Sequence, residues 1–257
     1  MSNMTVNSGT GMKKVIVLGA TSGIALEVQR RLAERACELL LVARSPQRLG
    51  ALQTDLLLRG APQVFTHSAD LSSVAQHNGV LEFASQSVPN FDTVLLAYGS
   101  MHDQKQATGS VGLLLEELQV DFVSAAAILT LFAGELERRR TGCIAAITSV
   151  AGDRGRRSNY VYGSAKGGLS LFLQGLRSRL YPADVQVITI KPGPVQTPMT
   201  DGLPNAGHFA DPKRVACDIV HSLERRSPDI LYTPRIWRYI MAGIELIPEN
   251  VFKRLPL

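Results

Sequence analysis

The sequence predicts an α/β fold, a single domain in which helices cover both faces of a doubly wound parallel sheet of about seven strands. Short apolar runs alternate with segments of helical periodicity. The runs span residues 15–19, 39–43, 63–67, 93–97, 143–148, 185–190 and 230–232. This alternation favours parallel strands joined by right-handed crossovers. Such a sheet has a crevice at the carboxyl ends of its strands, where the strand order reverses, so the crevice is the expected site.

Length and composition indicate one folded domain with a short leader and a C-terminal tail. The 257 residues are 45% hydrophobic and 19% charged, which suits one folded domain with a sizeable core. Residues 1–11 are small and polar and read as a flexible leader, not a signal peptide. We expect the main domain over residues 12–233 and an apolar, basic tail over 234–257. The three scattered cysteines favour reduced thiols in a cytoplasmic protein, and the five histidines lack ligand spacing, so no metal is expected.

A glycine turn joins the first predicted strand to the first predicted helix. Residues 19–25 read Gly-Ala-Thr-Ser-Gly-Ile-Ala. Gly19 permits a tight turn, Gly23 lets the backbone approach a phosphate, and the helix that follows offers free N–H groups and a positive dipole end. The spacing differs from the general dinucleotide fingerprint, and an ordinary strand-to-helix turn also accounts for it.

The most informative group is Ser149 with Tyr162 and Lys166. Tyr162 and Lys166 stand four residues apart, so they share one face of a helix. A neighbouring ammonium lowers the pKa of a phenol, which is about 10 when unperturbed, toward the range of a general acid or base. Residues of several kinds share the strand-end position, which suggests a single site: Gly19, Arg44, Asp70, Gly99, Ser149 and Pro192.

Together these segments resemble the short-chain dehydrogenase/reductase family in its classical form, from about Lys13 onward. The matching segments occur in the family's order: residues 19–25, 70–71, 147–152, 162–166 and 192–197. The resemblance implies a three-layer Rossmann fold and an oxidoreductase that transfers a hydride between a nicotinamide and a carbonyl or secondary alcohol. Residues 151–156 and 247–254 also resemble, more weakly, a bacterial subgroup that includes reductases of 2-keto sugars carried on polyprenyl phosphate.

The resemblance assigns the catalytic roles. It implies that Ser149 hydrogen-bonds the substrate oxygen, that Tyr162 transfers its proton, and that Lys166 holds the nicotinamide ribose and lowers the phenol pKa. Asp121 stands where the family has an asparagine that anchors a water molecule leading to the lysine. A carboxylate can accept a hydrogen bond from that water, but it also stabilises the lysine as a cation, so the direction of its net effect on Tyr162 stays open. A solvated helix residue is the alternative for Asp121.

The resemblance also assigns the cofactor-binding residues. They are Gly19, Thr21, Ser22, Gly23, Ile24, Arg44, Asp70, Leu71, Ala97, Gly99, Tyr162, Lys166, Pro192, Gly193, Val195 and Thr197. The second strand ends in Ala43, where an acid would accept the ribose hydroxyls of NAD, and Arg44 can pair with a 2′-phosphate. NADP(H) is therefore favoured over NAD(H), although an ordinary surface arginine also fits Arg44.

Two apolar segments, the predicted fourth helix and the C-terminal tail, indicate contacts with other molecules. The predicted fourth helix, residues 111–136, is apolar on several faces, which favours a subunit interface over a helix enclosed in its own domain. The family resemblance implies that this helix and the one bearing Tyr162 pair in a homodimer or homotetramer. The formal net charge is +5, and residues 236–247 form an apolar run near basic residues. This tail suits either the inner face of a membrane, beside a lipid-linked carbonyl substrate, or packing over the cleft or on a partner subunit. A small-molecule carbonyl substrate is the other possibility, and nucleic-acid binding is not expected.

Arg154, Arg156 and Arg157 precede Tyr162, where they can recognise a phosphate or carboxylate of a substrate or form structural salt bridges. The segment 199–211 is expected to build the substrate pocket. The alternative function is a nucleotide-binding sensor that keeps the fold and the cofactor cleft but has lost catalysis.

Overall fold

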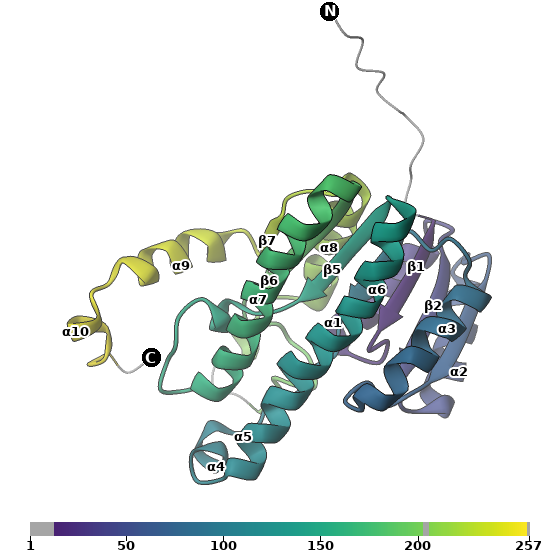
Figure 1. The fold of residues 1–257 in the computed structure, drawn as a ribbon. Coiled ribbons are helices and arrows are strands. Elements are labelled where there is room, and N and C mark those ends of the chain that lie inside the picture. The colour runs from purple at the N-terminus through teal and green to yellow at the C-terminus, as the bar shows by residue number, and fades with distance from the viewer. Residues whose placement is uncertain (1–12, 203–205, 256–257) are drawn as a thin grey trace, which may run out of the picture.

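The computed structural model describes residues 13–202 and 206–255, so the predicted leader and part of the segment 199–211 lie outside the described residues. The predicted sheet is confirmed: seven parallel strands lie in the order β3-β2-β1-β4-β5-β6-β7 (Figure 1). The strands are β1 (Lys14–Leu18), β2 (Glu38–Ala43), β3 (Val64–Ser68), β4 (Thr93–Leu96), β5 (Gly142–Ile147), β6 (Val185–Pro192) and β7 (Ile230–Thr233). The order reverses between β1 and β4, which places the expected crevice at the ends of these strands.

Helices cover both faces of the sheet, and others extend away from it (Figure 1). They are α1 (Gly23–Ala33), α2 (Pro46–Leu58), α3 (His77–Ser87), α4 (Gln104–Thr108), α5 (Val111–Leu118), α6 (Ala125–Arg139), α7 (Tyr160–Leu180), α8 (Pro212–Arg225), α9 (Ile236–Leu246) and α10 (Glu249–Phe252). Single turns η1 (Val74–Gln76), η3 (Val150–Gly152), η4 (Tyr181–Ala183) and η5 (Ala206–His208) are 3-10 helices, and η2 (Gln119–Ser124) is a π-helix.

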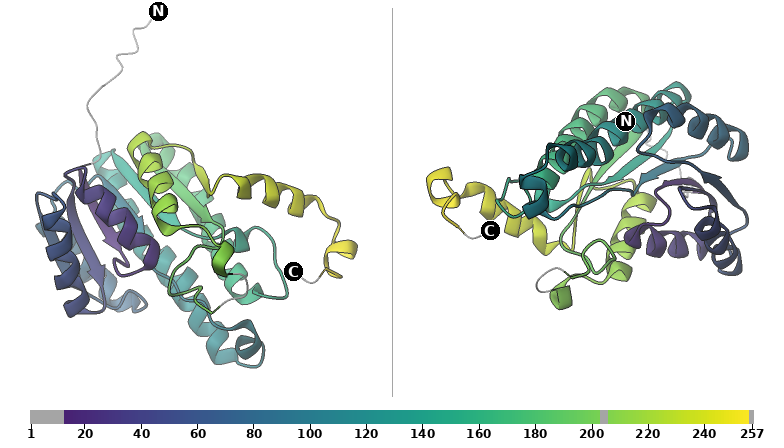
Figure 2. Two further views of the ribbon diagram at one scale, coloured as in Figure 1. Left: turned by 180° about the vertical axis from the view of Figure 1, so that it is seen from behind. Right: turned by 90° about the horizontal axis from the view of Figure 1, so that it is seen from below.

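Two hydrophobic cores fill the spaces between the layers. One core joins the sheet to α1, α2 and α8, and the other joins it to α3, α6 and α7 (Figure 2). Successive strand residues point to opposite faces, so Val15 and Val17 belong to one core and Ile16 and Leu18 to the other. A sheet buried on both faces needs continuously apolar strands, and this explains why the runs in the sequence are not alternating.

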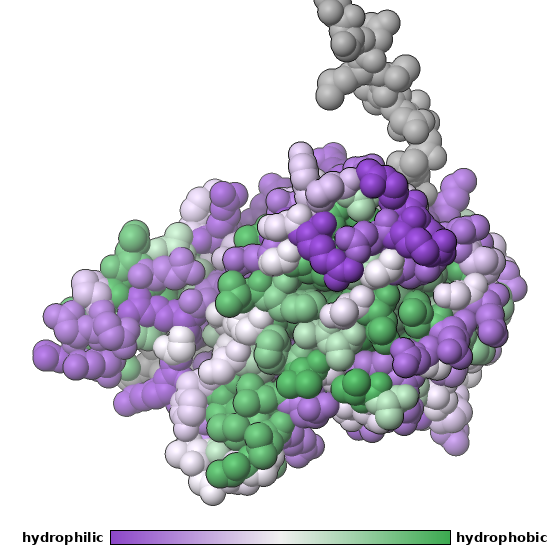
Figure 3. Space-filling model, in the orientation of Figure 1, coloured by the Kyte–Doolittle hydropathy of each residue, from purple (hydrophilic) through white to green (hydrophobic). Residues whose placement is uncertain are grey.

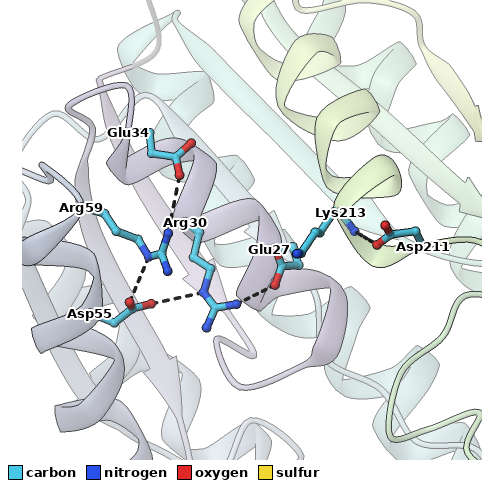
Figure 4. A network of polar contacts seen from close by, with 7 residues as sticks. All are labelled: Glu27, Arg30, Glu34, Asp55, Arg59, Asp211 and Lys213. Atoms are coloured by element: carbon cyan, nitrogen blue, oxygen red, sulfur yellow. Dashed lines mark hydrogen bonds and ion pairs between the residues drawn. The ribbon is translucent and has the colours of Figure 1, made fainter.

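Ion pairs tie α1 to α2 on the outside of the molecule (Figure 4). Arg30 of α1 lies 2.6 Å from Glu27 and 3.2 Å from Asp55 of α2. Asp55 is also 2.9 Å from Arg59. These partly exposed pairs are each worth about 1 kcal/mol or less, and none of their members lines the cleft.

The predicted fourth helix is interrupted. Instead of one α-helix, the structure has α5 and α6 joined by the π-helix η2. Such a turn inserts an extra residue into the helical ladder. Within η2, Asp121 and Ser124 are the buried residues, so the interruption turns two polar side chains toward the interior.

The C-terminal arm, which consists of α9 and α10, extends from the body of the domain (Figure 1). Met241 is its fully buried apolar side chain. Near its far end, the Arg154 guanidinium donates hydrogen bonds to the carbonyl oxygens of Ile244 at 2.6 Å and Ile247 at 2.7 Å and forms an ion pair with Glu249. The arm is therefore attached to the loop that precedes α7.

Candidate active site

A cleft of about 750 Å³ lies at the carboxyl ends of the strands. Of the residues predicted to form the site, all except Asp121 line it. The ends of the parallel strands thus bring these residues into one cavity, and its size suits a cofactor with a small substrate. Asp121 lies deeper, behind Lys166.

Close backbone packing brings Ser149 to Tyr162. Ser149 follows β5 and caps the turn η3, where its hydroxyl accepts a hydrogen bond from the Ala151 amide at 3.0 Å. This turn rests on the first turns of α7: a Cβ on Gly163 would lie 2.7 Å from the Ala151 carbonyl oxygen. Because only glycine allows this approach, the serine and tyrosine share one end of the cleft.

Lys166 forms a buried ion pair with Asp121. The Lys166 ammonium lies 2.7 Å from Asp121 Oδ1, and both side chains are nearly inaccessible to solvent. Asp121 Oδ2 accepts hydrogen bonds from the backbone amide and the hydroxyl of Ser100, each at 3.0 Å. A Cβ on Gly99 would lie 2.4 Å from Asp121 Oδ1 and 3.0 Å from the ammonium. Gly99 therefore makes room for the pair.

Electrostatics at the site favour a protonated phenol and a charged lysine. Burial raises the pKa of Tyr162; Lys166 opposes that shift, Asp121 adds to it, and the pKa remains above its ordinary value. Burial disfavours the Lys166 ammonium, but Asp121 and the nearby phenol outweigh burial, so the pKa of Lys166 is raised. The Lys166 ammonium lowers the phenol pKa in part, but burial and Asp121 outweigh it, so the predicted net lowering of the Tyr162 pKa is not found.

The glycine turn forms the middle of the cleft. Gly19 has a φ of +90°, and a Cβ there would lie 2.6 Å from the backbone nitrogen of Tyr98. A Cβ on Gly23 would lie 2.8 Å from the Thr197 side chain. The Ser22 hydroxyl caps α1 by accepting from the Ala25 amide at 3.3 Å. The turn thus presents the N-terminus of α1 to the cleft, a favourable place for a phosphate.

Arg44 and Asp70 line the far end of the cleft, beyond the glycine turn. One Asp70 oxygen accepts from the amide and hydroxyl of Ser72, at 3.1 and 2.7 Å, and these bonds lower the pKa of Asp70. Arg48, in the first turn of α2, also lines this end and donates to the Thr21 carbonyl oxygen at 3.3 Å. Sequence reasoning missed Arg48, although its position four residues after Arg44 was a signal.

Trp237 is a second residue that sequence reasoning assigned only to the tail. It lines the cleft, and a Cβ on Gly193 would lie 1.9 Å from its indole nitrogen. The first turn of the C-terminal arm therefore closes the cleft next to residues 192–197. Met101 and Asn159 are further lining residues without a sequence signal. Arg156 and Phe209, of the predicted arginine group and the segment 199–211, also line the cleft.

Fold and cleft together define a dinucleotide-type α/β domain with a Ser-Tyr-Lys site. The family model described as short chain dehydrogenase matches residues 13–206. An uncharacterized oxidoreductase of Mycobacterium tuberculosis is 32% identical over 247 residues, 96% of this chain and 98% of the relative. Another, from Streptomyces coelicolor, is 32% identical over 248 residues, 95% of this chain and 96% of the relative. The chain belongs to the short-chain dehydrogenase family and is an oxidoreductase of that family.

Solved structures agree with the fold. A short-chain dehydrogenase from Sphingobium yanoikuyae in complex with NADPH has a TM-score of 0.78 at 21% identity, covering 92% of this chain and 97% of that one. A short-chain dehydrogenase from Burkholderia cenocepacia in complex with NADP has a TM-score of 0.81 at 19% identity, covering 96% and 100%. Among the described residues, no helix has the length and apolar character to cross a membrane, and no cluster of histidine, cysteine and acidic side chains forms a metal site.

Proposed function

We propose that the protein is an NADP(H)-dependent oxidoreductase that acts on a carbonyl or secondary alcohol, with Tyr162 as the general acid or base. The observation that carries this proposal is the convergence of Ser149, Tyr162 and Lys166 at one end of a cleft that also contains the N-terminus of α1. A bound nicotinamide would supply or accept the hydride at this end.

Proton transfer follows from the charges around Tyr162. Because burial raises its pKa, the phenol is protonated at neutral pH and can donate to the oxygen of a carbonyl that is being reduced. Ser149, whose hydroxyl opposes the rise in the Tyr162 pKa, would hold the same oxygen. The phenolate left behind lies near the Lys166 ammonium, which is 5.7 Å from the ring centroid. Lys166 thus stabilises the product of the proton transfer.

Asp121 is a positioning residue in this scheme. Its carboxylate fixes the Lys166 ammonium from the side away from the cleft and keeps it charged. The cost is a higher phenol pKa, so at neutral pH Tyr162 is in the protonated form that donates to a carbonyl oxygen.

The described residues fit a nicotinamide dinucleotide phosphate. Gly23 and the N-terminus of α1 would hold the diphosphate, and Arg44 with Arg48 would pair with the 2′-phosphate. Arg44→Ala should then weaken NADPH binding by roughly 10- to 100-fold while changing NADH binding little. The matched control is Arg59→Ala, at the residue that follows α2 and outside the cleft. Equal losses for both cofactors in Arg44→Ala would reject the preference.

The function is tested by NADPH oxidation across a panel of aldehydes and ketones. The Tyr162→Phe variant should lose turnover by roughly 10²- to 10⁴-fold and still bind NADPH. Full turnover in that variant would reject the mechanism. Tight NADPH binding with no turnover of any carbonyl by the native protein would instead support a nucleotide-binding sensor.

We further propose a homodimer or homotetramer. Apolar side chains are exposed along α5, η2 and α7, where Val111 is 74% and Leu171 68% exposed. Figure 3 shows this apolar surface gathered over α5. Light scattering should give a mass at least twice that of the chain, and a monomer would reject the proposal.

The exposed face of the C-terminal arm supports contact with a partner subunit or a membrane surface. Tyr239 is 71% and Leu246 83% exposed, and basic residues lie nearby. Sedimentation with vesicles and deletion of residues 236–257 separate the two. Binding to anionic but not to neutral vesicles would support contact with a membrane. Contact with a partner subunit would be supported if the protein binds no vesicles and its oligomer dissociates when residues 236–257 are deleted.

A further inference from the structure

The three arginines between Ser149 and Tyr162 have different surroundings. Arg154 is engaged by the C-terminal arm, with its guanidinium against carbonyl oxygens of the arm and 3.9 Å from the centroid of the Phe252 ring. Arg157 is exposed and does not line the cleft. Arg156 lines the cleft and is only partly exposed. The structure therefore separates three residues that are equivalent in the sequence.

Arg156 has no anionic partner within the described part of the chain. No described carboxylate lies within ion-pair distance of its guanidinium, and its buried Nε lacks a hydrogen-bond partner among the described atoms. Burial lowers the pKa of Arg156, and the more distant Asp153 opposes this. The carboxylate of Asp153 forms an ion pair with Lys191 and accepts a hydrogen bond from the Tyr232 hydroxyl at 3.0 Å. A partly desolvated guanidinium without a partner gains free energy when an anion binds it.

The side-chain amide of Asn159 also has a buried polar atom without a hydrogen-bond partner among the described residues. Asn159 lines the cleft three residues beyond Arg156, and its Oδ1 is buried with no hydrogen-bond donor among the described residues. Buried polar atoms are nearly always paired in folded proteins. Both residues line the same cavity as Ser149 and Tyr162, and their unpaired polar atoms indicate a polar ligand at this end of the cleft.

The phosphates of the cofactor do not account for Arg156. The 2′-phosphate is expected at Arg44, which follows β2, whereas Arg156 lies beyond the end of β5. Two strands, β1 and β4, separate β2 from β5, a distance on the order of 14 Å at the usual strand spacing. The diphosphate is expected at the N-terminus of α1, between these two ends. Arg156 is thus an additional cation on the substrate side.

We propose that Arg156 binds an anionic group of the substrate, a carboxylate or phosphate carried on the carbonyl compound. Asn159 receives a hydrogen bond from a hydroxyl or N–H group of the same molecule. The planar guanidinium suits bidentate pairing with either anion, so this pairing orients the carbonyl toward Tyr162. The inference rests on the proposed function and names the substrate class of the same site.

Carbonyl pairs that differ in charge test the proposal with NADPH. Acetoacetate is compared with methyl acetoacetate, and dihydroxyacetone phosphate with dihydroxyacetone. The native protein should prefer at least one charged member, and Arg156→Gln should lower kcat/KM for that member by roughly 10- to 100-fold while changing the neutral member less than about 3-fold. Arg156→Lys should recover part of the loss. The pair that responds distinguishes a carboxylate from a phosphate.

Arg157→Gln is the matched control and should leave both members unchanged. No charge preference in the native protein, or equal losses for charged and neutral members in Arg156→Gln, would overturn the proposal. Equal losses would assign Arg156 a structural role, which a lower Tm of that variant would confirm.

A measurement without turnover separates this proposal from the proposed function. Calorimetric titration of the NADPH-loaded protein uses malonate and inorganic phosphate as probes. Binding of either probe that weakens in Arg156→Gln but not in Arg157→Gln supports the anion site even if no carbonyl is reduced. The opposite result is turnover that requires Tyr162 while the affinity for both probes is unchanged in Arg156→Gln. It would overturn the anion site and leave the proposed function intact.

Discussion

The Asp121 carboxylate and the Lys166 ammonium lie 2.7 Å apart in the interior, with both side chains withdrawn from solvent. Burying two charges is expensive unless each is paired and hydrogen-bonded, and the two hydrogen bonds from Ser100 complete the surroundings of the carboxylate. The pair affects the proposed proton transfer through the pKa of Tyr162, which Asp121 raises and Lys166 lowers.

Asp121→Asn should lower the pKa of Tyr162, because the carboxylate that raises it is gone. Alcohol oxidation needs the phenolate, so the pH at which its rate is half maximal should fall. Stability should decrease by about 1–3 kcal/mol, since the buried ammonium loses its counterion. The rate–pH profile and urea unfolding measure the two effects. Glu82→Gln, an exposed residue of α3, is the control, and an unmoved or higher midpoint in Asp121→Asn would contradict the assignment.

Gly99→Ala should destabilise the protein by about 1–3 kcal/mol and reduce turnover, because the new methyl would overlap Asp121 Oδ1 and crowd the Lys166 ammonium. The control is Gly134→Ala in α6, where a Cβ meets no atom within 4 Å among the described residues. That change should stabilise the helix by about 0.5–1 kcal/mol. Thermal unfolding compares the variants, and similar melting temperatures would argue against close packing at Gly99.

Glu117→Gln should change stability in a pH-dependent way. Burial raises the pKa of Glu117 above its ordinary value of 4.5, so the folded state binds its proton more tightly than the unfolded chain. The contribution of Glu117 to the free energy of unfolding is therefore greatest at a pH below the ordinary pKa, and it is lost as the pH rises through the raised pKa of the folded state. The variant should gain stability relative to native protein at about pH 8 more than at about pH 5. Melting curves test this, with Glu82→Gln as control; a gain that is independent of pH would exclude the titration of Glu117.

Arg154→Ala should release the C-terminal arm. The guanidinium hydrogen-bonds carbonyl oxygens near the end of α9, so its loss should increase the local opening of α9 by roughly 10- to 100-fold. Hydrogen exchange of the α9 amides measures this opening. Arg157→Ala should leave the exchange unchanged, and equal protection in both variants would show that Met241 and Trp237 suffice to hold the arm.

Much of the site was predictable because its residues stand at the ends of strands. Gly19, Asp70, Ser149 and Pro192 are far apart in the chain, but parallel strands deliver their carboxyl ends to one edge. The continuous helix through residues 111–136 was wrong in detail: apolar periodicity does not distinguish an α-helix from one that contains a π turn. The turn itself buries Asp121, which no periodic pattern shows.

The sequence alone determined the order of strands and helices, the glycine turn, and the Tyr162–Lys166 spacing, since these depend on local periodicity and on residues four apart. Tertiary structure decided how Asp121 faces Lys166, how Trp237 meets Gly193, and which arginine remains unpaired. These relationships join segments that are remote in the sequence, and each is fixed by packing. Burial then sets the balance of charge at Tyr162, because the strength of an ion pair depends on the solvent that the fold excludes.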